Sequence, residues 1–150
     1  MQDLLKQIMI RINENIYVKD PESSDLGKNI IRESILMIDE LGLEHFTFKK
    51  LAERLHTVES SIYRYFENKH KLLIYLNSWY WGWMEYRLVF STVNIQDPVD
   101  EWKSAIRVLS DPVQSEVFFP HINFEKLNHI IISESPKVYL TKDVDEEKRQ

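Results

Sequence analysis

The side chains best suited to binding chemistry lie in one short stretch of the chain. Arg64 carries a guanidinium group that can make a bidentate contact with guanine or hold a phosphate. The phenol of Tyr63 can donate to a phosphate oxygen, while Ser60 and Ser61 are small enough to let a helix sit deep in a groove. Glu59 repels phosphate, but its carboxylate can accept from a cytosine amino group. These residue types indicate contact with nucleic acid rather than catalysis.

Further polar residues surround this stretch. Thr47 and Lys49 precede it and could grip a sugar–phosphate backbone, and Thr57 is expected to cap the helix that carries it. Lys69 follows at the start of a longer helix, where its ammonium joins the free amides and the positive end of the helix dipole as a phosphate clamp. Tyr65 has two interpretations that remain open, packing in the core or contact with a groove.

The surrounding apolar pattern predicts two short helices joined by a tight turn and followed at once by a longer helix. Leu51, Ala52 and Leu55 recur at helical spacing in the first helix, and Ile62 and Phe66 anchor the second. Between them the apolar spacing breaks and then resumes. This is the layout of a helix-turn-helix, in which the second helix enters the major groove of DNA.

A longer motif extends this layout. Its members are Gly42, Phe46, Thr47, Ala52, Ile62-Tyr63, Tyr65-Phe66, Lys69 and Leu72. Over residues 26–73 this pattern resembles the TetR-type transcriptional regulators. The resemblance implies an all-α protein, with a three-helix DNA-binding head followed by a helical body that binds an effector and dimerises. It also implies that the first helix of the head points Lys28 toward the DNA.

The turn departs from the family pattern. His56, Thr57 and Val58 stand where a glycine, an apolar residue and a hydroxyl residue are usual. Histidine tolerates a left-handed backbone better than β-branched residues do. Together with Glu59, these changes affect the expected affinity and operator, and leave the expected fold unchanged.

Residues 1–25 are expected to form an N-terminal extension. Alternating β-branched residues favour an extended arm or hairpin over residues 8–18, which could contact DNA through Lys6 or Arg11 or pack on its neighbour. Helix-start residues at 23–25 then lead into an amphipathic helix over residues 26–41, which Gly42 ends.

Charge is distributed unevenly along the chain of 150 residues, whose formal net charge is −5. Residues 45–71 hold six bases against three acids, whereas residues 91–150 hold seven bases against eleven acids. A basic face on an acidic body suits a protein that orients toward phosphate. The absence of cysteine excludes disulfides and thiolate metal sites. No leader or membrane-spanning stretch is visible, so a cytoplasmic, nucleoid-associated protein without a membrane partner is expected.

Residues 74–150 are expected to form the effector-binding and dimerisation body. Trp79, Trp83, Tyr86 and Phe90 share one face of a long helix and could line a pocket for a hydrophobic or aromatic ligand, or could be core residues. Further helices are predicted after Asp97-Pro98, to about residue 109, and from Asn123 to Ile132. Residues 143–150 resemble the opening turns of a helix, so this body is expected to lack the usual C-terminal pair of helices.

One constellation suggests different chemistry. His121, Glu125 and His129 recur every four residues and could present metal ligands on one helix face, but Pro120 argues against a helical His121. No nucleophile constellation or phosphate-binding glycine loop accompanies them, so neither a metal, a cofactor nor an enzyme activity is predicted.

The sequence therefore predicts a TetR-like regulator that binds double-stranded DNA as a homodimer. We expect a repressor on a palindromic operator, released by a small hydrophobic or aromatic effector. Two alternatives remain open. One is an α-helical protein-interaction module with a degenerate helix-turn-helix, and the other is a metal-dependent enzyme.

Overall fold

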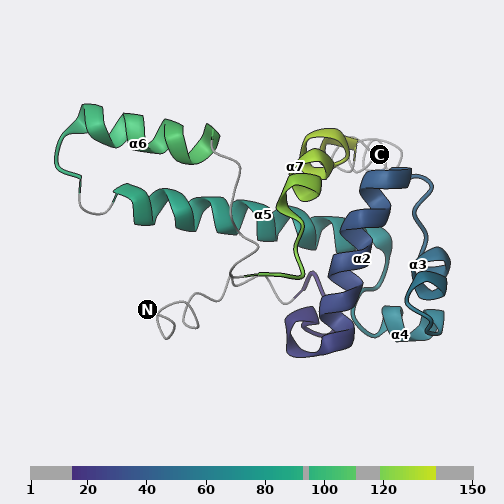
Figure 1. Ribbon diagram of the computed structural model, residues 1–150. Coiled ribbons are helices and arrows are strands. Elements are labelled where there is room, and N and C mark those ends of the chain that lie inside the picture. Colours follow the sequence, from purple (N-terminus) through teal and green to yellow (C-terminus); the bar gives the residue numbers. More distant parts are fainter. Residues whose placement is uncertain (1–14, 93–94, 111–118, 138–150) are drawn as a thin grey trace, which may run out of the picture.

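The computed structural model describes residues 15–92, 95–110 and 119–137. The elements in chain order are η1 (Pro21–Ser23), α2 (Asp25–Leu41), α3 (Phe48–Arg54), α4 (Glu59–Tyr63), α5 (Lys69–Thr92), α6 (Pro98–Ser110) and α7 (Phe124–Ser133) (Figure 1). These ranges contain helices and no strand, which confirms the all-α prediction. Most of the predicted arm or hairpin, and the helical start over residues 143–150, lie outside the described residues.

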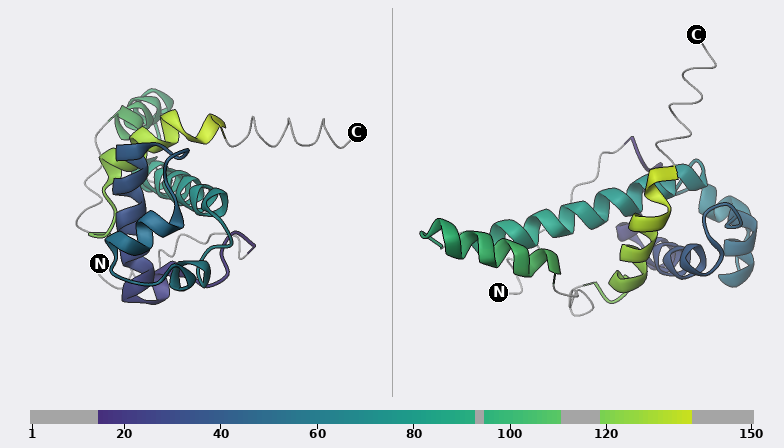
Figure 2. Two further views of the ribbon diagram at one scale, coloured as in Figure 1. Left: turned by 90° about the vertical axis from the view of Figure 1, so that its right-hand side faces the viewer. Right: turned by 90° about the horizontal axis from the view of Figure 1, so that it is seen from above.

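The long helix α5 connects two ends of the molecule. At one end, α2, α3 and α4 gather around its first turns, while α6 turns back and runs alongside its last turns (Figures 1 and 2). Helix α7 packs against both α2 and α5. We call the end formed by α2, α3, α4 and the start of α5 the head, and the end formed by α6 and the last turns of α5 the distal hairpin.

Helix boundaries in the head are set by capping residues. The Ser24 hydroxyl accepts from the Gly27 amide at 3.0 Å, and the Thr47 hydroxyl accepts from the Lys50 amide at 3.2 Å. Each side chain thereby satisfies one of the amides that a helix start leaves without an intrahelical partner. Gly42 ends α2 with φ 78° and ψ 158°, a backbone region that is essentially restricted to glycine.

The later helices also begin as predicted. The Asp97 carboxylate accepts from the Val99 amide at 3.0 Å, with Pro98 in the first helical position of α6. The Asn123 side chain accepts from the Lys126 amide at 3.1 Å and starts α7. Both predicted helices are therefore confirmed in the described part of the chain.

The head is built on one buried face of α2. Ile30, Ile31, Ile35 and Ile38 point inward from this helix, and aliphatic and aromatic residues of the next three helices meet them. Burying a side chain of this size contributes about 1.5–3 kcal/mol, so each of these isoleucines stabilises the head. Gly27 permits the close approach of η1, because a Cβ there would lie 2.1 Å from the Pro21 carbonyl oxygen.

An aromatic cluster joins the head to α5. The Tyr75 ring lies edge-on to Phe66, with centroids 5.3 Å apart, and to Tyr17 at 6.1 Å. Burial raises the pKa of the Tyr75 phenol, and the nearby charges of Glu22 and Asp20 raise it further. The phenol therefore stays neutral and behaves as part of the core.

Candidate nucleic-acid interface

Helix α4 has a buried side and an exposed side. Ile62 is fully buried on the inner side, and Phe66 is buried directly after the helix. Ser60, Tyr63 and Arg64 are exposed on the outer side. This short helix is thus anchored from beneath and presents a hydroxyl, a phenol and a guanidinium to solvent, as the helix-turn-helix interpretation predicts.

The Tyr63 ring is held against α3. It lies edge-on to Phe48 with centroids 5.0 Å apart, while about half of the residue, 47%, remains exposed. An edge-to-face pair of this kind fixes the ring plane. Tyr63 therefore combines a positioned ring with a polar end that faces outward.

The turn between α3 and α4 contains a strained position. His56 has φ 53°, in the left-handed region where glycine is the least strained residue. The Thr57 amide donates to the Ala52 carbonyl at 3.0 Å and closes the turn. The prediction that Thr57 caps the following helix is wrong, because Val58 occupies the N-cap position and offers no side-chain acceptor.

Lys69 has a different role from the phosphate clamp expected from its position. Its ammonium donates to the backbone carbonyls of Leu43, Glu44 and Phe46, at 2.8, 3.2 and 3.1 Å. A lysine ammonium has three N–H donors, so all of them are occupied by the loop between α2 and α3. The geometry makes Lys69 a positioning residue that fixes the entry to α3.

Tyr65 packs in the core and does not contact a groove, so the first of its two expected roles is the one observed. The residue is buried, and its hydroxyl forms a hydrogen bond of 2.6 Å with the Ser24 hydroxyl at the start of α2. Its carbonyl accepts from the Val18 amide at 2.8 Å, and the Lys19 ammonium lies 5.2 Å from the centroid of its ring. Groove contact by this side chain is therefore excluded in this arrangement.

The remaining predicted contact residues lie around α4. Thr47, Lys49 and Glu59 are exposed, while Lys28 and Ser61 are half-buried. Thr47 and Lys49 lie at the start of α3, Lys28 in the first turn of α2, and Glu59 and Ser61 on α4 itself. The structure thus places these residues on the three helices of the head, and none of them in its core.

Two further bases of the head are engaged within the protein. The Lys50 ammonium donates to the His45 carbonyl at 2.7 Å. Arg54 pairs with Glu40 at 3.1 Å and lies 3.8 Å from Glu33. The positive charge that α3 and α4 present to solvent therefore depends mainly on Lys49 and Arg64.

The predicted aromatic pocket is a stack instead. The rings of Trp79, Trp83, Tyr86 and Phe90 follow one another with centroid separations of 6.2, 5.7 and 6.0 Å. Phe119 lies edge-on to the first two rings, and both tryptophans are buried. Of the two expected roles, packing in the core is the one that this geometry supports for both tryptophans. Tyr86 is half-buried and Phe90 is exposed.

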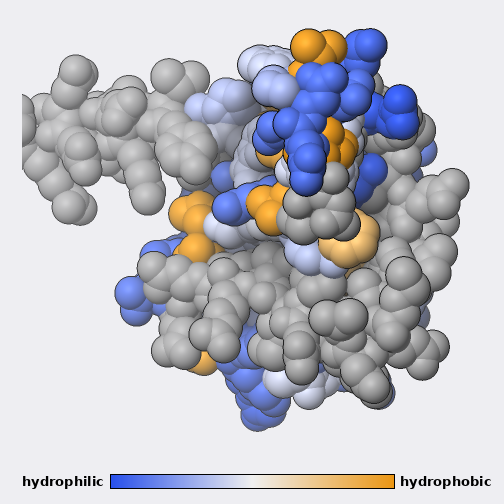
Figure 3. All heavy atoms as spheres, turned by 90° about the vertical axis from the view of Figure 1, so that its left-hand side faces the viewer, coloured by the Kyte–Doolittle hydropathy of each residue, from blue (hydrophilic) through white to orange (hydrophobic). Residues whose placement is uncertain are grey.

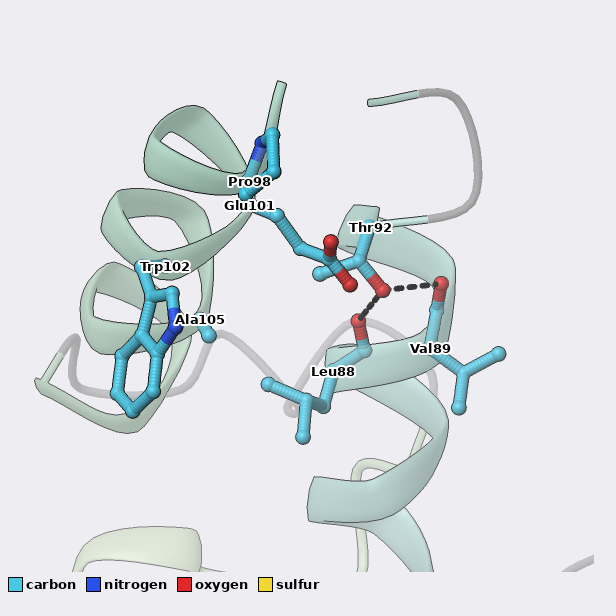
Figure 4. A pocket seen from close by; sticks show the side chains of 7 residues that line it. All are labelled: Leu88, Val89, Thr92, Pro98, Glu101, Trp102 and Ala105. Carbon is cyan, nitrogen blue, oxygen red and sulfur yellow. Dashed lines mark hydrogen bonds between the residues drawn. The ribbon is translucent and has the colours of Figure 1, made fainter. Parts of the chain in front are cut away.

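A hollow of about 360 Å³ lies elsewhere, between α5 and α6 (Figure 4). Its walls are Leu88, Val89, Thr92, Pro98, Glu101, Trp102 and Ala105. The Thr92 hydroxyl donates back to the Leu88 carbonyl at 2.9 Å. The sequence contained a signal for this surface, because the α6 residues of the wall recur at helical spacing.

The two histidines of the possible metal site contact different carboxylates. His121 is buried, and its Nε2 lies 2.8 Å from the Glu22 carboxylate, while His129 lies 3.5 Å from Asp39. Across residues 15–92, 95–110 and 119–137, no group of three metal-ligating side chains is assembled. Nor does any helix within these ranges have the length and apolar character needed to cross a bilayer.

Comparison with known proteins supports the helix-turn-helix interpretation. Residues 30–76 match the model of a family described as bacterial regulatory proteins, tetR family. Searches of curated proteins and of solved structures gave no match. The matched residues run from α2 through α3 and α4 into α5, and so include the whole helix-turn-helix. Residues 30–76 therefore resemble the N-terminal helix-turn-helix domain of TetR-type transcriptional regulators.

Proposed function

We propose that this chain represses transcription by binding a palindromic operator as a homodimer, in the cytoplasm and on the nucleoid. The observation that carries the proposal is the outer side of α4, where Ser60, Tyr63 and Arg64 are exposed above the buried Ile62. A recognition helix must expose its reading residues and anchor its other side at the same time. Helix α4 meets both requirements.

The roles of the side chains follow from their chemistry. Arg64 reads a guanine edge, and Ser60 and Ser61 allow close approach to the groove floor. Tyr63 donates to a phosphate oxygen, as do Thr47 and Lys49 from the start of α3. Glu59 selects for cytosine, because its carboxylate accepts from the exocyclic amino group.

The remaining predicted contact lies on α2. Lys28 is half-buried in the first turn of this helix, and its ammonium reaches the phosphate backbone beside the groove. Two copies related by a two-fold axis read two half-sites of opposite orientation, which is why we propose a palindromic operator.

The proposed effector is a small hydrophobic or aromatic molecule that releases the protein from DNA. The support is the outer end of the aromatic stack, where Phe90 is exposed and Tyr86 is half-buried. A planar ligand could extend this stack by offset contact with the Phe90 ring. Tryptophan fluorescence that is unchanged across a library of such compounds would count against this part of the proposal.

Selection of bound duplexes from a random library tests the DNA-binding part. We expect enrichment of an inverted repeat, and affinity that falls steeply as salt rises, because bound phosphates release counterions. A pool without enrichment, together with affinity independent of salt, would instead support an interaction module with a degenerate helix-turn-helix. The carboxylate of Glu59 on the outer side of α4 and the net charge of −5 are the observations that favour this second function.

A further inference from the structure

Val58 is an exposed apolar residue in a head that buries most of its apolar side chains. Exposed hydrophobic residues are frequent at the distal end of the molecule, where they reach the surface among hydrophilic ones (Figure 3). Among the aliphatic residues of the head, Val58 is 65% exposed and Leu41 follows at 37%. A single exposed valine is ordinary by itself. The position of Val58 and its local conformation are what require an explanation.

This position normally favours a different residue type. Val58 is the N-cap of α4, and its carbonyl accepts from the Ser61 amide at 3.0 Å. Serine, threonine, aspartate and asparagine are preferred at an N-cap because their side chains accept from the first free amides, and valine is among the poorest choices. The head uses Ser24 and Thr47 in this way, whereas Val58 makes no capping bond. Folding of α4 therefore gives no reason for a valine here.

A second local preference is broken two residues earlier. His56 has φ 53°, in the left-handed region that disfavours residues with a side chain. The Thr57 amide donates to the Ala52 carbonyl at 3.0 Å and closes the turn that leads into Val58. Departures of this kind concentrate at functional sites, where binding rather than stability decides the residue. The turn places Val58 directly before the exposed Glu59 of α4.

A valine side chain can recognise only one feature of a base edge in the major groove. It neither donates nor accepts hydrogen bonds, so it has no favourable contact with phosphates or with the donors and acceptors of the bases. Thymine alone presents a methyl group there, at C5. Contact between valine and this methyl group removes apolar surface of both from water. In a helix-turn-helix, the first residues of the recognition helix are the ones that reach base edges.

We propose that Val58 reads the 5-methyl group of a thymine in each half-site of the operator. The proposal rests on the DNA binding proposed above and adds a specificity-determining residue to those assigned there. Glu59, the next residue along the chain, is assigned to a cytosine, so the thymine should lie close to that cytosine in the same half-site. Because the contact is apolar, it should contribute specificity without adding to the salt dependence of binding.

Replacement of thymine by deoxyuridine in the selected duplex, with the full chain as the binding protein, tests this contact. Uracil pairs with adenine as thymine does and lacks only the 5-methyl group, so replacing each thymine in turn isolates that group. We expect the wild type to bind about fourfold more weakly when the thymine read by Val58 is replaced, the loss expected for one buried methyl group. The slope of log affinity against log salt should not change, because no phosphate contact is lost.

Val58→Ser separates base reading from folding. Serine removes both methyl groups and supplies the capping hydroxyl, so the variant should unfold at a higher urea concentration than the wild type, yet bind the thymine and uracil duplexes equally. General damage to the head cannot raise stability and abolish this discrimination at the same time. Val99→Ser is the matched control, because Val99 is 59% exposed on α6, outside the helix-turn-helix. It should keep the wild-type preference for thymine.

Three results would overturn this inference and leave the proposed function intact. The first is a selected site without thymine, and the second is a wild type whose affinity does not change with uracil at any thymine position. The third is a Val58→Ser variant that distinguishes thymine from uracil as the wild type does. A wild type that binds no duplex would instead overturn the proposed function, and the role of Val58 with it.

Discussion

The head buries most of its apolar residues, whereas the distal hairpin exposes several of its own. In the head, the isoleucines of α2 and the anchors of α4 are fully buried, and the surface of α4 is mostly polar. In the distal hairpin, Phe90 and Trp102 are 69% and 71% exposed. The comparison indicates that most apolar residues of the head are covered within the protein, with α7 packed on α2. The distal hairpin leaves apolar side chains exposed, so the two ends should respond differently to the same substitution.

Truncation of one phenylalanine at each end should give the largest contrast. Phe66→Ala removes a fully buried ring from the head, and we expect a loss of about 3–5 kcal/mol in the free energy of unfolding. Phe90→Ala removes an exposed ring and should cost less than about 0.5 kcal/mol in the monomer. Urea denaturation followed by circular dichroism measures both values. Similar losses for the two variants would contradict the contrast between the two ends.

Lys69 and Lys49 separate stability from DNA contact within the head. Lys69→Met should cost about 1–3 kcal/mol of stability, because three backbone carbonyls lose their donor. Lys49→Met should leave stability within about 0.5 kcal/mol, but should reduce the slope of log affinity against log salt by about 1. Thermal unfolding and binding to a random duplex at several salt concentrations provide the two measurements. If Lys69→Met also reduced the slope of log affinity against log salt, Lys69 would contact phosphate as first expected.

Arg64 tests whether the outer side of α4 reads bases. Arg64→Ala should reduce the preference for the selected duplex over a random one by about 1–3 kcal/mol. Arg32→Ala is the control, because Arg32 is also an exposed arginine, on α2, and its guanidinium donates to Asn29 at 2.7 Å. Competition binding with the two duplexes gives the preference directly. Equal losses on both duplexes for Arg64→Ala would leave this residue as a phosphate contact without a reading role.

The strained turn should give the smallest effect. His56→Gly relieves the positive φ of 53° and should stabilise the head by about 0.5 kcal/mol, since part of the gain is offset by the greater entropy of glycine in the unfolded chain. His56→Val should destabilise it, because a β-branched residue is more strained in the left-handed region. Denaturation midpoints measure both. If the two variants shift in the same direction, backbone strain is not the cause.

The sequence predicts the head more completely than the hairpin for a physical reason. Capping by Ser24 and Thr47, and the glycine end of α2, depend on neighbouring residues, so the sequence contains the whole signal. The burial of Tyr65 and the carbonyl contacts of Lys69 depend on residues more than twenty positions away, and local spacing does not report them.

The aromatic residues of α5 show the same limit. Four rings at helical spacing fit a pocket wall and a packed stack equally well, and Phe119, far along the chain, decides between them. The sequence could not predict that one side of α6 is exposed. An amphipathic pattern predicts that a helix side is covered, but it does not identify the element that covers it.

Protection of a single thiol on α4 tests the central claim most directly. The chain contains no cysteine, so Ser60→Cys introduces a unique thiol on the exposed side of the proposed recognition helix. Ser133→Cys provides an exposed control on α7. We predict that saturating double-stranded DNA slows alkylation of Ser60→Cys by at least about tenfold, because the helix enters the major groove, and leaves Ser133→Cys unchanged. Equal alkylation rates with and without bound DNA at position 60 would contradict the account.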